Sequence, residues 1–114
     1  MARTREQVYQ HHARALDAGD LDELVADYAD DAVLITPAGV KRGKDGIREG
    51  YMRIFGDLPK ATWNLRTQIY EGDLMFVEWA AASAAAFGEG VATFVITDGL
   101  IRAQTLHFTV QHRI

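Results

Sequence analysis

Polar and apolar residues near the N-terminus follow the 3.6-residue period of an amphipathic helix. Thr4 and Gln7 form a capping box, in which each side chain bonds an otherwise unpaired amide of the first turn. The apolar stripe behind it consists of Val8, His12, Ala15 and Leu16. Gly19 suits the left-handed residue that ends a helix. We therefore expect a helix that runs to about residue 18.

A second, short helix is predicted after a two-residue break. Asp20 and Glu23 repeat the capping pair. The apolar face of this helix consists of Leu21, Leu24, Val25 and Tyr28. Asp30 and Asp31 are interpreted as a solvated turn where it ends. The two helices should form a bent pair.

The middle of the chain predicts a strand followed by a third helix. Residues 33–36 are rich in β-branched side chains, and Pro37 and Gly39 stop the strand. Residues 43–46 are interpreted as a turn. The helix that follows should bury one face and end at Gly56; that face consists of Ile47, Tyr51, Ile54 and Phe55.

The second half of the chain predicts strands only. Turn residues at 71–73, 88–90 and 98–99 separate four segments: 62–71, 74–87, 91–97 and 100–112. Asp98-Gly99 is a strong signal for a two-residue hairpin. The alanine-rich run at 80–86 has helical propensity, but the turns on both sides favour a strand.

Both faces of the segment at 74–82 are apolar. One face consists of Met75, Val77, Trp79 and Ala81, and the other contains Phe76, Ala80 and Ala82. A sheet with one solvated face should instead carry polar residues at every second position. Three short helices cannot cover both faces, so we expect a homodimer through the outer face of the sheet; the alternative is a monomer with an unusually apolar surface.

Composition narrows the possible partners. The length of 114 residues fits a single domain over 1–114. The net charge is −4, and no basic cluster exceeds Lys41-Arg42 with Lys44, which argues against nucleic acid. The longest apolar run, 79–87, is too short to cross a membrane, and the N-terminus has no signal-like apolar segment. We expect a soluble, cytoplasmic protein with no metal, because the histidine spacing fits no ligand pair, and no cofactor, because no phosphate-binding loop is present.

Residues 15–51, ALDAGDLDELVADYADDAVLITPAGVKRGKDGIREGY, resemble the opening of the nuclear-transport-factor-2-like superfamily. That superfamily includes ketosteroid isomerases and the SnoaL-like polyketide cyclases. The resemblance implies an α+β fold in which a cone-shaped, curved antiparallel sheet wraps around three N-terminal helices, the cystatin-like α+β barrel. It also implies a pocket for an apolar small molecule, although this fold serves both enzymes and binding domains.

The resemblance does not extend to the isomerase chemistry. Ketosteroid isomerases use an Asp base on the first strand, with a Tyr and a protonated Asp as the oxyanion hole. By alignment the base position falls on Thr36, the Tyr position on His12 and the second Asp position on or near Ala92. Only Tyr51 matches a polar residue of the isomerase pocket. Steroid isomerisation by that route is therefore rejected.

Two residues are candidates for acid–base chemistry. His12 lies on the buried stripe of the first helix, and imidazole titrates near physiological pH; the alternative is a core histidine bonded to a backbone carbonyl. Glu78 interrupts an apolar run and shares a face with Phe76 and Ala80, which by the alignment lines the pocket. A desolvated carboxylate there would have a raised pKa and could act as a base. The alternative is an exposed Glu or a dimer salt bridge.

Further residues are predicted to bind the ligand: Tyr28, Thr36, Tyr51, Trp63, Phe94, Gln104, Leu106 and Phe108. Gln104 could orient a ligand carbonyl, whereas the aromatic residues are mainly walls. Two functions remain open at this point. One is a cofactor-independent isomerase, cyclase or dehydratase that acts on an apolar, polycyclic carbonyl compound with Glu78 or His12 as acid or base. The other is a non-catalytic binding or dimerisation module with the same pocket.

Overall fold

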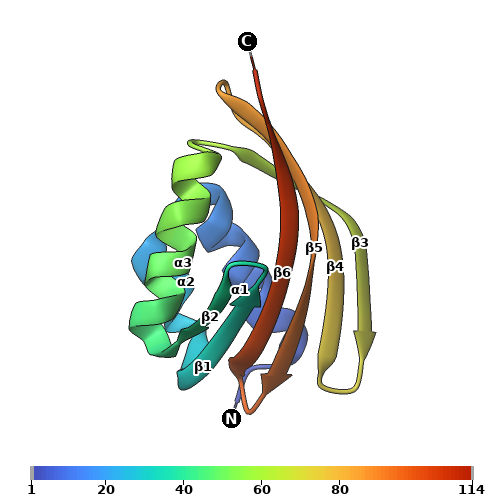
Figure 1. Cartoon of the computed structure of the whole chain (residues 1–114). Helices are drawn as coiled ribbons and strands as arrows, with labels where there is room; N and C mark the ends of the chain where they lie inside the picture. The colour runs from blue at the N-terminus through green and yellow to red at the C-terminus, as the bar shows by residue number, and fades with distance from the viewer. Residues whose placement is uncertain (1, 114) are drawn as a thin grey trace.

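A computed structural model describes residues 2–113 and has the predicted α+β architecture. Its three helices are α1 (Arg5–Ala18), α2 (Leu21–Ala26) and α3 (Gly43–Asp57). The strands are β1 (Tyr28–Thr36), β2 (Gly39–Arg42), β3 (Thr62–Glu71), β4 (Leu74–Ala82), β5 (Ala86–Thr97) and β6 (Leu100–His112). All three helices lie on the concave face of one curved sheet (Figure 1). The predicted fold class is confirmed.

The sheet differs from the prediction in one pairing. Its strand order is β2-β1-β6-β5-β4-β3, and β1 runs parallel to β6. The other neighbouring pairs are antiparallel, so the sheet is mixed and not antiparallel throughout. The pairing is parallel because α3 separates β1–β2 from the four-stranded meander, which then returns to β1.

The predicted ends of the first two helices are largely confirmed. The Thr4 hydroxyl accepts a hydrogen bond from the Gln7 amide at 3.1 Å, and the Thr4 amide donates to the Gln7 side chain at 2.9 Å. Gly19 has a φ of 64°, in the left-handed region. Asp20 accepts from the Glu23 amide at 3.2 Å. These signals are local, which is why the sequence alone was sufficient to find them.

Two boundaries in the middle of the chain were predicted wrongly. Tyr28 is not on α2 but is the first residue of β1, where it pairs with Ile101 of β6. Residues 43–46 are not a turn but the first turn of α3. A Cβ at Gly46 would lie 3.1 Å from the carbonyl carbon of Lys41, so this glycine allows the helix to approach β2 closely.

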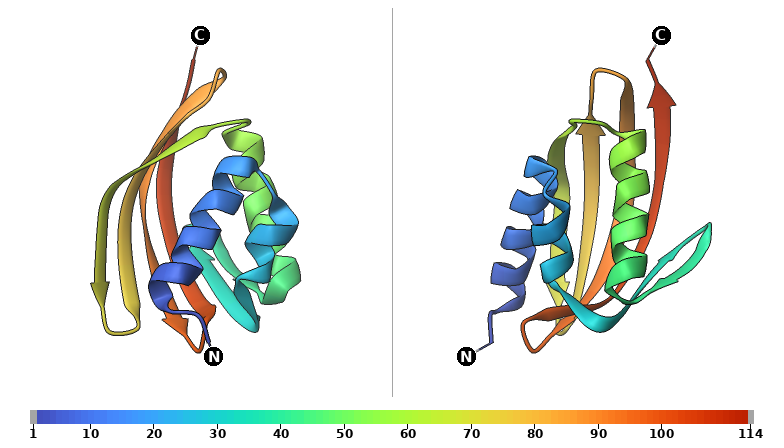
Figure 2. Two further views of the ribbon diagram at one scale, coloured as in Figure 1. Left: turned by 180° about the vertical axis from the view of Figure 1, so that it is seen from behind. Right: turned by 90° about the vertical axis from the view of Figure 1, so that its left-hand side faces the viewer.

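The hairpin formed by β1 and β2 was not predicted. β1 ends at Thr36, as predicted, but the chain turns at residues 37–38 and returns as β2, and the two strands pair from Val33–Arg42 to Thr36–Gly39. Figure 2 shows this hairpin projecting from the body of the domain. A four-residue strand at the sheet edge leaves too short a pattern for sequence periodicity to identify.

The turn between β4 and β5 lies at residues 83–85 and not at the predicted 88–90. The Ser83 hydroxyl stabilises this turn by accepting from the amides of Ala85 and Ala86 at 3.2 and 3.0 Å. The alanine-rich run therefore contains a strand end and a turn, and no helix. Gly88 and Gly90 lie inside β5, where they permit close packing.

The core lies between the helices and the concave face of the sheet. Strand β4 illustrates the two faces, because Met75, Val77 and Ala81 are buried whereas Leu74 and Phe76 are exposed. No helix formed by residues 2–113 lies on the convex face (Figure 1). None of the helices within residues 2–113 is long and apolar enough to span a membrane.

Gly90 lets β5 and β6 approach each other closely. It pairs with Trp79 on one side and Phe108 on the other, and the rings of these two residues lie 5.6 Å apart across it. A Cβ at this position would lie 2.5 Å from Cβ of Phe108 and would also collide with the His107 carbonyl oxygen. The absence of a side chain is therefore a packing requirement.

We predict that Gly90→Ala lowers the free energy of unfolding by about 2 kcal/mol, because overpacked sites typically cost that much. Urea unfolding followed by circular dichroism measures the change. Gly56→Ala is the matched control, since a Cβ there would have no neighbour within 4 Å. In an exposed helix that change should stabilise the fold by about 0.5–1 kcal/mol. Equal midpoints for Gly90→Ala and the unmodified chain would contradict the prediction.

Candidate functional site

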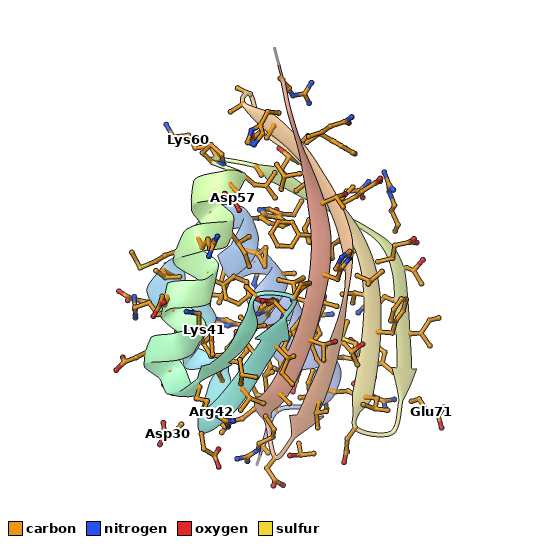
Figure 3. All side chains as sticks on the ribbon, in the orientation of Figure 1. Asp30, Lys41, Arg42, Asp57, Lys60 and Glu71 are labelled. Atoms are coloured by element: carbon orange, nitrogen blue, oxygen red, sulfur yellow. The ribbon has the colours of Figure 1, made fainter. Side chains whose placement is uncertain are left out.

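A cavity of about 340 Å³ lies between the helices and the concave face of the sheet. Helices α1 and α3 form one side, and strands β3 to β6 form the other. Its lining is mainly apolar, with a few polar groups from α1, α3 and β6. In Figure 3 the side chains of Lys60 and Glu71 lie at the periphery of the molecule, away from this interior. The site is thus a largely apolar pocket with selected polar groups.

His12 projects from α1 into this region and is 1% exposed. Aromatic rings surround it, with centroids between 5.3 and 6.0 Å from that of the imidazole: Tyr9, Tyr28, Tyr51 and Phe94. Burial lowers the pKa of His12 to about 4, and the Asp27 carboxylate opposes that shift only in part. The imidazole is therefore neutral at pH 7.

The tautomer of His12 follows from its surroundings. Nδ1 is buried and has no hydrogen-bond partner among the described residues. The alternative of a core histidine whose Nδ1 bonds a backbone carbonyl therefore does not apply. Buried N–H groups without an acceptor are rarer than unpaired acceptors, so we assign the proton to Nε2. His12 then offers a neutral N–H donor from its other ring nitrogen.

Three buried side chains from different elements form a hydrogen-bonded triad beside His12. The hydroxyl of Tyr51 (α3) donates to Oε1 of Gln104 (β6) at 2.9 Å, and the hydroxyl of Tyr28 (β1) also donates to this oxygen. The two hydroxyl oxygens lie 3.0 Å apart. Burial raises the pKa of Tyr51 to about 12 and raises that of Tyr28 well above its ordinary value. Both hydroxyls keep their protons at neutral pH.

The triad determines what Gln104 offers to a ligand. Its Oε1 already accepts two hydrogen bonds, and both hydroxyl protons are used within the triad. Gln104 itself lines the cavity. Its Nε2 amide group is therefore the part available to a ligand, and it is a donor.

The remaining predicted ligand-binding residues divide into three groups. Trp63, Phe94 and Leu106 line the cavity together with Tyr51 and Gln104. Tyr28 and Phe108 lie behind that lining; Phe108 packs on Trp79, which in turn packs on Trp63 at 5.2 Å between ring centroids. Thr36 lies outside, where its hydroxyl accepts from the Ala38 amide at 3.1 Å in the β1–β2 turn.

The prediction that Glu78 faces the pocket is wrong. The residue lies on the convex face of β4, is exposed, and accepts a hydrogen bond from the Thr67 hydroxyl at 2.9 Å. The pocket is lined instead by its neighbours Val77 and Trp79. Alternation correctly separated the two faces of β4, but the wrong face was assigned to the interior. A base at Glu78 cannot serve this cavity.

The sequence interpretation missed Tyr9, Asp17 and Asn64, which also line the cavity. Asp17 is exposed at the end of α1, and its carboxylate accepts from the Trp63 amide at 3.4 Å. Burial raises the pKa of Tyr9, and this hydroxyl also stays protonated. Continuing the helical stripe from His12 back to Tyr9 and forward to Asp17 would have found both residues. Within residues 2–113 no three His, Asp or Glu side chains are grouped as metal ligands.

The low pKa of His12 predicts a loss of stability in acid. Above pH 6.5 His12 is neutral in both states, so the shift contributes nothing. Below that pH the unfolded chain takes up a proton, whereas folded His12 does so only near pH 4. At about 1.4 kcal/mol per pKa unit, the free energy of unfolding should fall by about 3 kcal/mol between pH 7 and pH 4 from this group.

Urea titrations of the unmodified chain and His12→Gln at pH 7, 5.5 and 4 measure this contribution as a difference. The free energy of unfolding of His12→Gln should rise relative to that of the unmodified chain as the pH falls. His11→Gln is the opposing control, because a hydrogen bond to Asp27 raises the pKa of His11. His11 therefore adds stability below its unfolded pKa, and that stability is lost as the pH rises through its folded pKa. Parallel stability curves for His12→Gln and the unmodified chain would contradict the lowered pKa.

Solved structures similar to this chain share its fold. A protein from Kribbella flavida DSM 17836 superposes with a TM-score of 0.79 at 16% identity, over 90% of this chain and 84% of that one. An NTF-2 like protein of unknown function from Burkholderia xenovorans LB400 gives 0.77 at 22%, over 91% and 81%. IdmH from Streptomyces antibioticus, a candidate polyketide cyclase, gives 0.78 at 17%, over 93% and 92%. At these identities the similarity shows the fold alone.

Sequence comparison identifies the family. A comparison with curated proteins gives no match. The SnoaL-like domain matches residues 9–104, a range that contains α2, α3 and most of the cavity-lining part of the sheet. The chain therefore belongs to the SnoaL-like domain family.

Proposed function

We propose that this protein binds a neutral, largely apolar small molecule that places an acceptor oxygen, such as a carbonyl, at the His12–Gln104 end of the cavity. The observation that carries the proposal is the pair of N–H donors that His12 and Gln104 leave free at this end. His12 is neutral, and its buried Nδ1 has no hydrogen-bond partner among residues 2–113. Oε1 of Gln104 already accepts hydrogen bonds from two tyrosine hydroxyls. The protons that His12 and Gln104 still offer a ligand are on N–H groups, so the ligand atom that receives them should be an acceptor.

The pKa shifts favour a ligand without charge. Burial raises the pKa of Tyr9, Tyr28 and Tyr51 and lowers that of His12. Each shift is towards the neutral form, which means that the site disfavours both anions and cations. A ketone, quinone or ester should therefore bind better than a carboxylic acid or an amine of the same shape.

The size and walls of the cavity favour a flat ring system. Its volume of about 340 Å³ falls within the range usual for small-molecule sites. Trp63, Trp79 and Phe94 provide aromatic surface along its length. Aromatic side chains bind flat rings by offset or edge-to-face packing. A polycyclic carbonyl compound has both properties.

Acid–base catalysis at His12 is the second candidate, as a cofactor-independent isomerase, cyclase or dehydratase. It is favoured by the position of His12 against the ligand space and by the shared fold with IdmH, a candidate polyketide cyclase. The pKa of about 4 makes His12 a weak base at pH 7, and general bases act best with a pKa near the working pH. Binding is therefore the first conclusion.

We predict about tenfold weaker ligand binding for His12→Phe and for Gln104→Leu, because each change removes one hydrogen bond to the ligand worth about 1.4 kcal/mol. Gln104→Leu also removes the acceptor of Tyr28 and Tyr51, so its circular dichroism spectrum and thermal unfolding are compared with those of the unmodified chain before binding is measured. A thermal-shift screen of steroid, polyketide and terpenoid ketones would find a ligand, and calorimetry would give its Kd. Each ketone is tested beside a carboxylic acid and an amine with the same ring system. Glu49→Gln, on the exposed face of α3, is the control and should bind normally.

Tighter binding of the acid or amine analogue would overturn the proposed ligand class. Turnover assays on the hits separate the two functions. His12→Gln keeps an N–H donor but has no basicity, so a catalytic His12 predicts lost turnover with ligand affinity retained. No turnover by the unmodified chain on any bound ketone would leave binding as the function.

A further inference from the structure

The hydroxyl of Tyr9 differs from those of the other tyrosines in its bonding. The chain has four tyrosines. The hydroxyls of Tyr28 and Tyr51 belong to the buried triad, and that of Tyr70 accepts a hydrogen bond from the Gln68 side chain at 2.8 Å. The Tyr9 hydroxyl has no hydrogen-bond partner among the described residues. A buried polar group without a partner in the protein needs an explanation, and contact with a ligand is one.

The Tyr9 hydroxyl opens into the cavity. Tyr9 is 6% exposed and lines the cavity, and its ring centroid lies 5.5 Å from those of both His12 and Phe94. Among residues 2–113, Nδ1 of His12 is the one unpaired side-chain polar atom that the protein encloses completely. The Tyr9 hydroxyl is unpaired as well, so it meets open space. For a side chain this deeply buried in the lining, that space is the cavity.

The surroundings keep this hydroxyl protonated and place it among the elements that enclose the cavity. Burial raises the pKa of Tyr9, and Tyr51, Tyr70 and Asp17 raise it further. Those three groups belong to α3, to β3 and to the last turn of α1. A protonated phenol can donate one hydrogen bond and can also accept. Both capacities of Tyr9 are therefore available to a ligand.

We propose that Tyr9 is a specificity-determining residue whose hydroxyl binds a hydrogen-bond donor, such as a hydroxyl group, on the ligand. This inference rests on the proposed function, in which His12 and Gln104 bind the carbonyl and so orient the ligand. Tyr9 and His12 lie one turn apart on α1, and a helical turn rises by about 5.4 Å. The carbonyl and the donor should therefore lie along the same edge of a flat ring system. The ligand is then a hydroxylated ketone and not a plain ketone.

A donor suits this part of the cavity better than a second carbonyl does. The Asp17 carboxylate, which also lines the cavity, attracts donors and repels acceptors near Tyr9. It accepts a hydrogen bond from the Trp63 amide at 3.4 Å, which leaves most of its acceptor capacity unused. A plain ketone would cover Tyr9 with apolar atoms and leave its hydroxyl unpaired, which is unfavourable. Sites that bond a ligand hydroxyl discriminate strongly against analogues that lack it.

Matched ligands and a matched variant test this contact. The probes are fluorenone, its 2-, 3- and 4-hydroxy isomers and the corresponding methyl ethers, which keep the oxygen but cannot donate. In calorimetry with the unmodified chain, at least one hydroxy isomer should have a Kd about tenfold below that of fluorenone, and its methyl ether should not. Tyr9→Phe keeps the ring without the hydroxyl, so it should remove this preference. Fluorenone itself should bind Tyr9→Phe at least as tightly as it binds the unmodified chain.

Tyr70→Phe is the matched control. The Tyr70 hydroxyl is already bonded to Gln68, so this variant should keep the preference for the hydroxy isomer. Urea unfolding without ligand checks the structural role of Tyr9. Tyr9→Phe should have the same midpoint as the unmodified chain or a higher one, because the deleted hydroxyl has no partner in the protein. A lower midpoint would mean that the hydroxyl serves the fold, and would count against the inference.

His12→Phe separates this inference from the proposed function. It should weaken fluorenone and the preferred hydroxy isomer by the same factor, because both probes carry the carbonyl. If His12→Phe weakens neither probe while Tyr9→Phe still removes the preference, the carbonyl contact is wrong and the Tyr9 contact stands. Equal Kd values for fluorenone and every hydroxy isomer would refute the role of Tyr9. A preference that survives Tyr9→Phe, or no measurable binding of any hydroxy isomer, would refute it as well.

Discussion

The hydrogen bonds among Tyr28, Tyr51 and Gln104 connect the three parts of the molecule that close the inner end of the cavity. They join β1, α3 and β6 in a region where all three side chains are buried. In such surroundings an unmade hydrogen bond is costly, so the three side chains hold one another in a single arrangement. His12 lies against this triad without joining it, and that is why its donor stays available.

Local chemistry made the ends of the first two helices predictable from the sequence, whereas the errors fell where long-range pairing decides the structure. Thr4, Gly19 and Asp20 act on amides within a few residues, so their roles follow from spacing alone. Tyr28 continues a helical stripe, yet its pairing with Ile101, far along the chain, places it on a strand. In the sequence Gly88 and Gly90 have the composition of a turn. The close contacts that require glycine at these positions are made with residues distant in the sequence, so the sequence alone does not reveal them.

The candidate site shows the same division. The helical stripe placed His12 and Tyr51 correctly, because the buried side of an amphipathic helix is defined by its own apolar residues. Strand β4 is apolar on both sides, so periodicity separated Glu78 from Val77 without showing which side faces inward. That choice depends on where the helices pack.

Gly90 has a consequence for how this family member could acquire new ligand selectivity. The glycine does not line the cavity, but it lies between Trp79 and Phe108, whose rings pack across β5, and Trp79 is part of the cavity wall beside Trp63. Substitutions at the aromatic positions would change the shape of the cavity while the backbone keeps its curvature. A side chain at position 90 would alter both together. Evolution of a wider or narrower site should therefore proceed through the rings and leave this backbone position fixed.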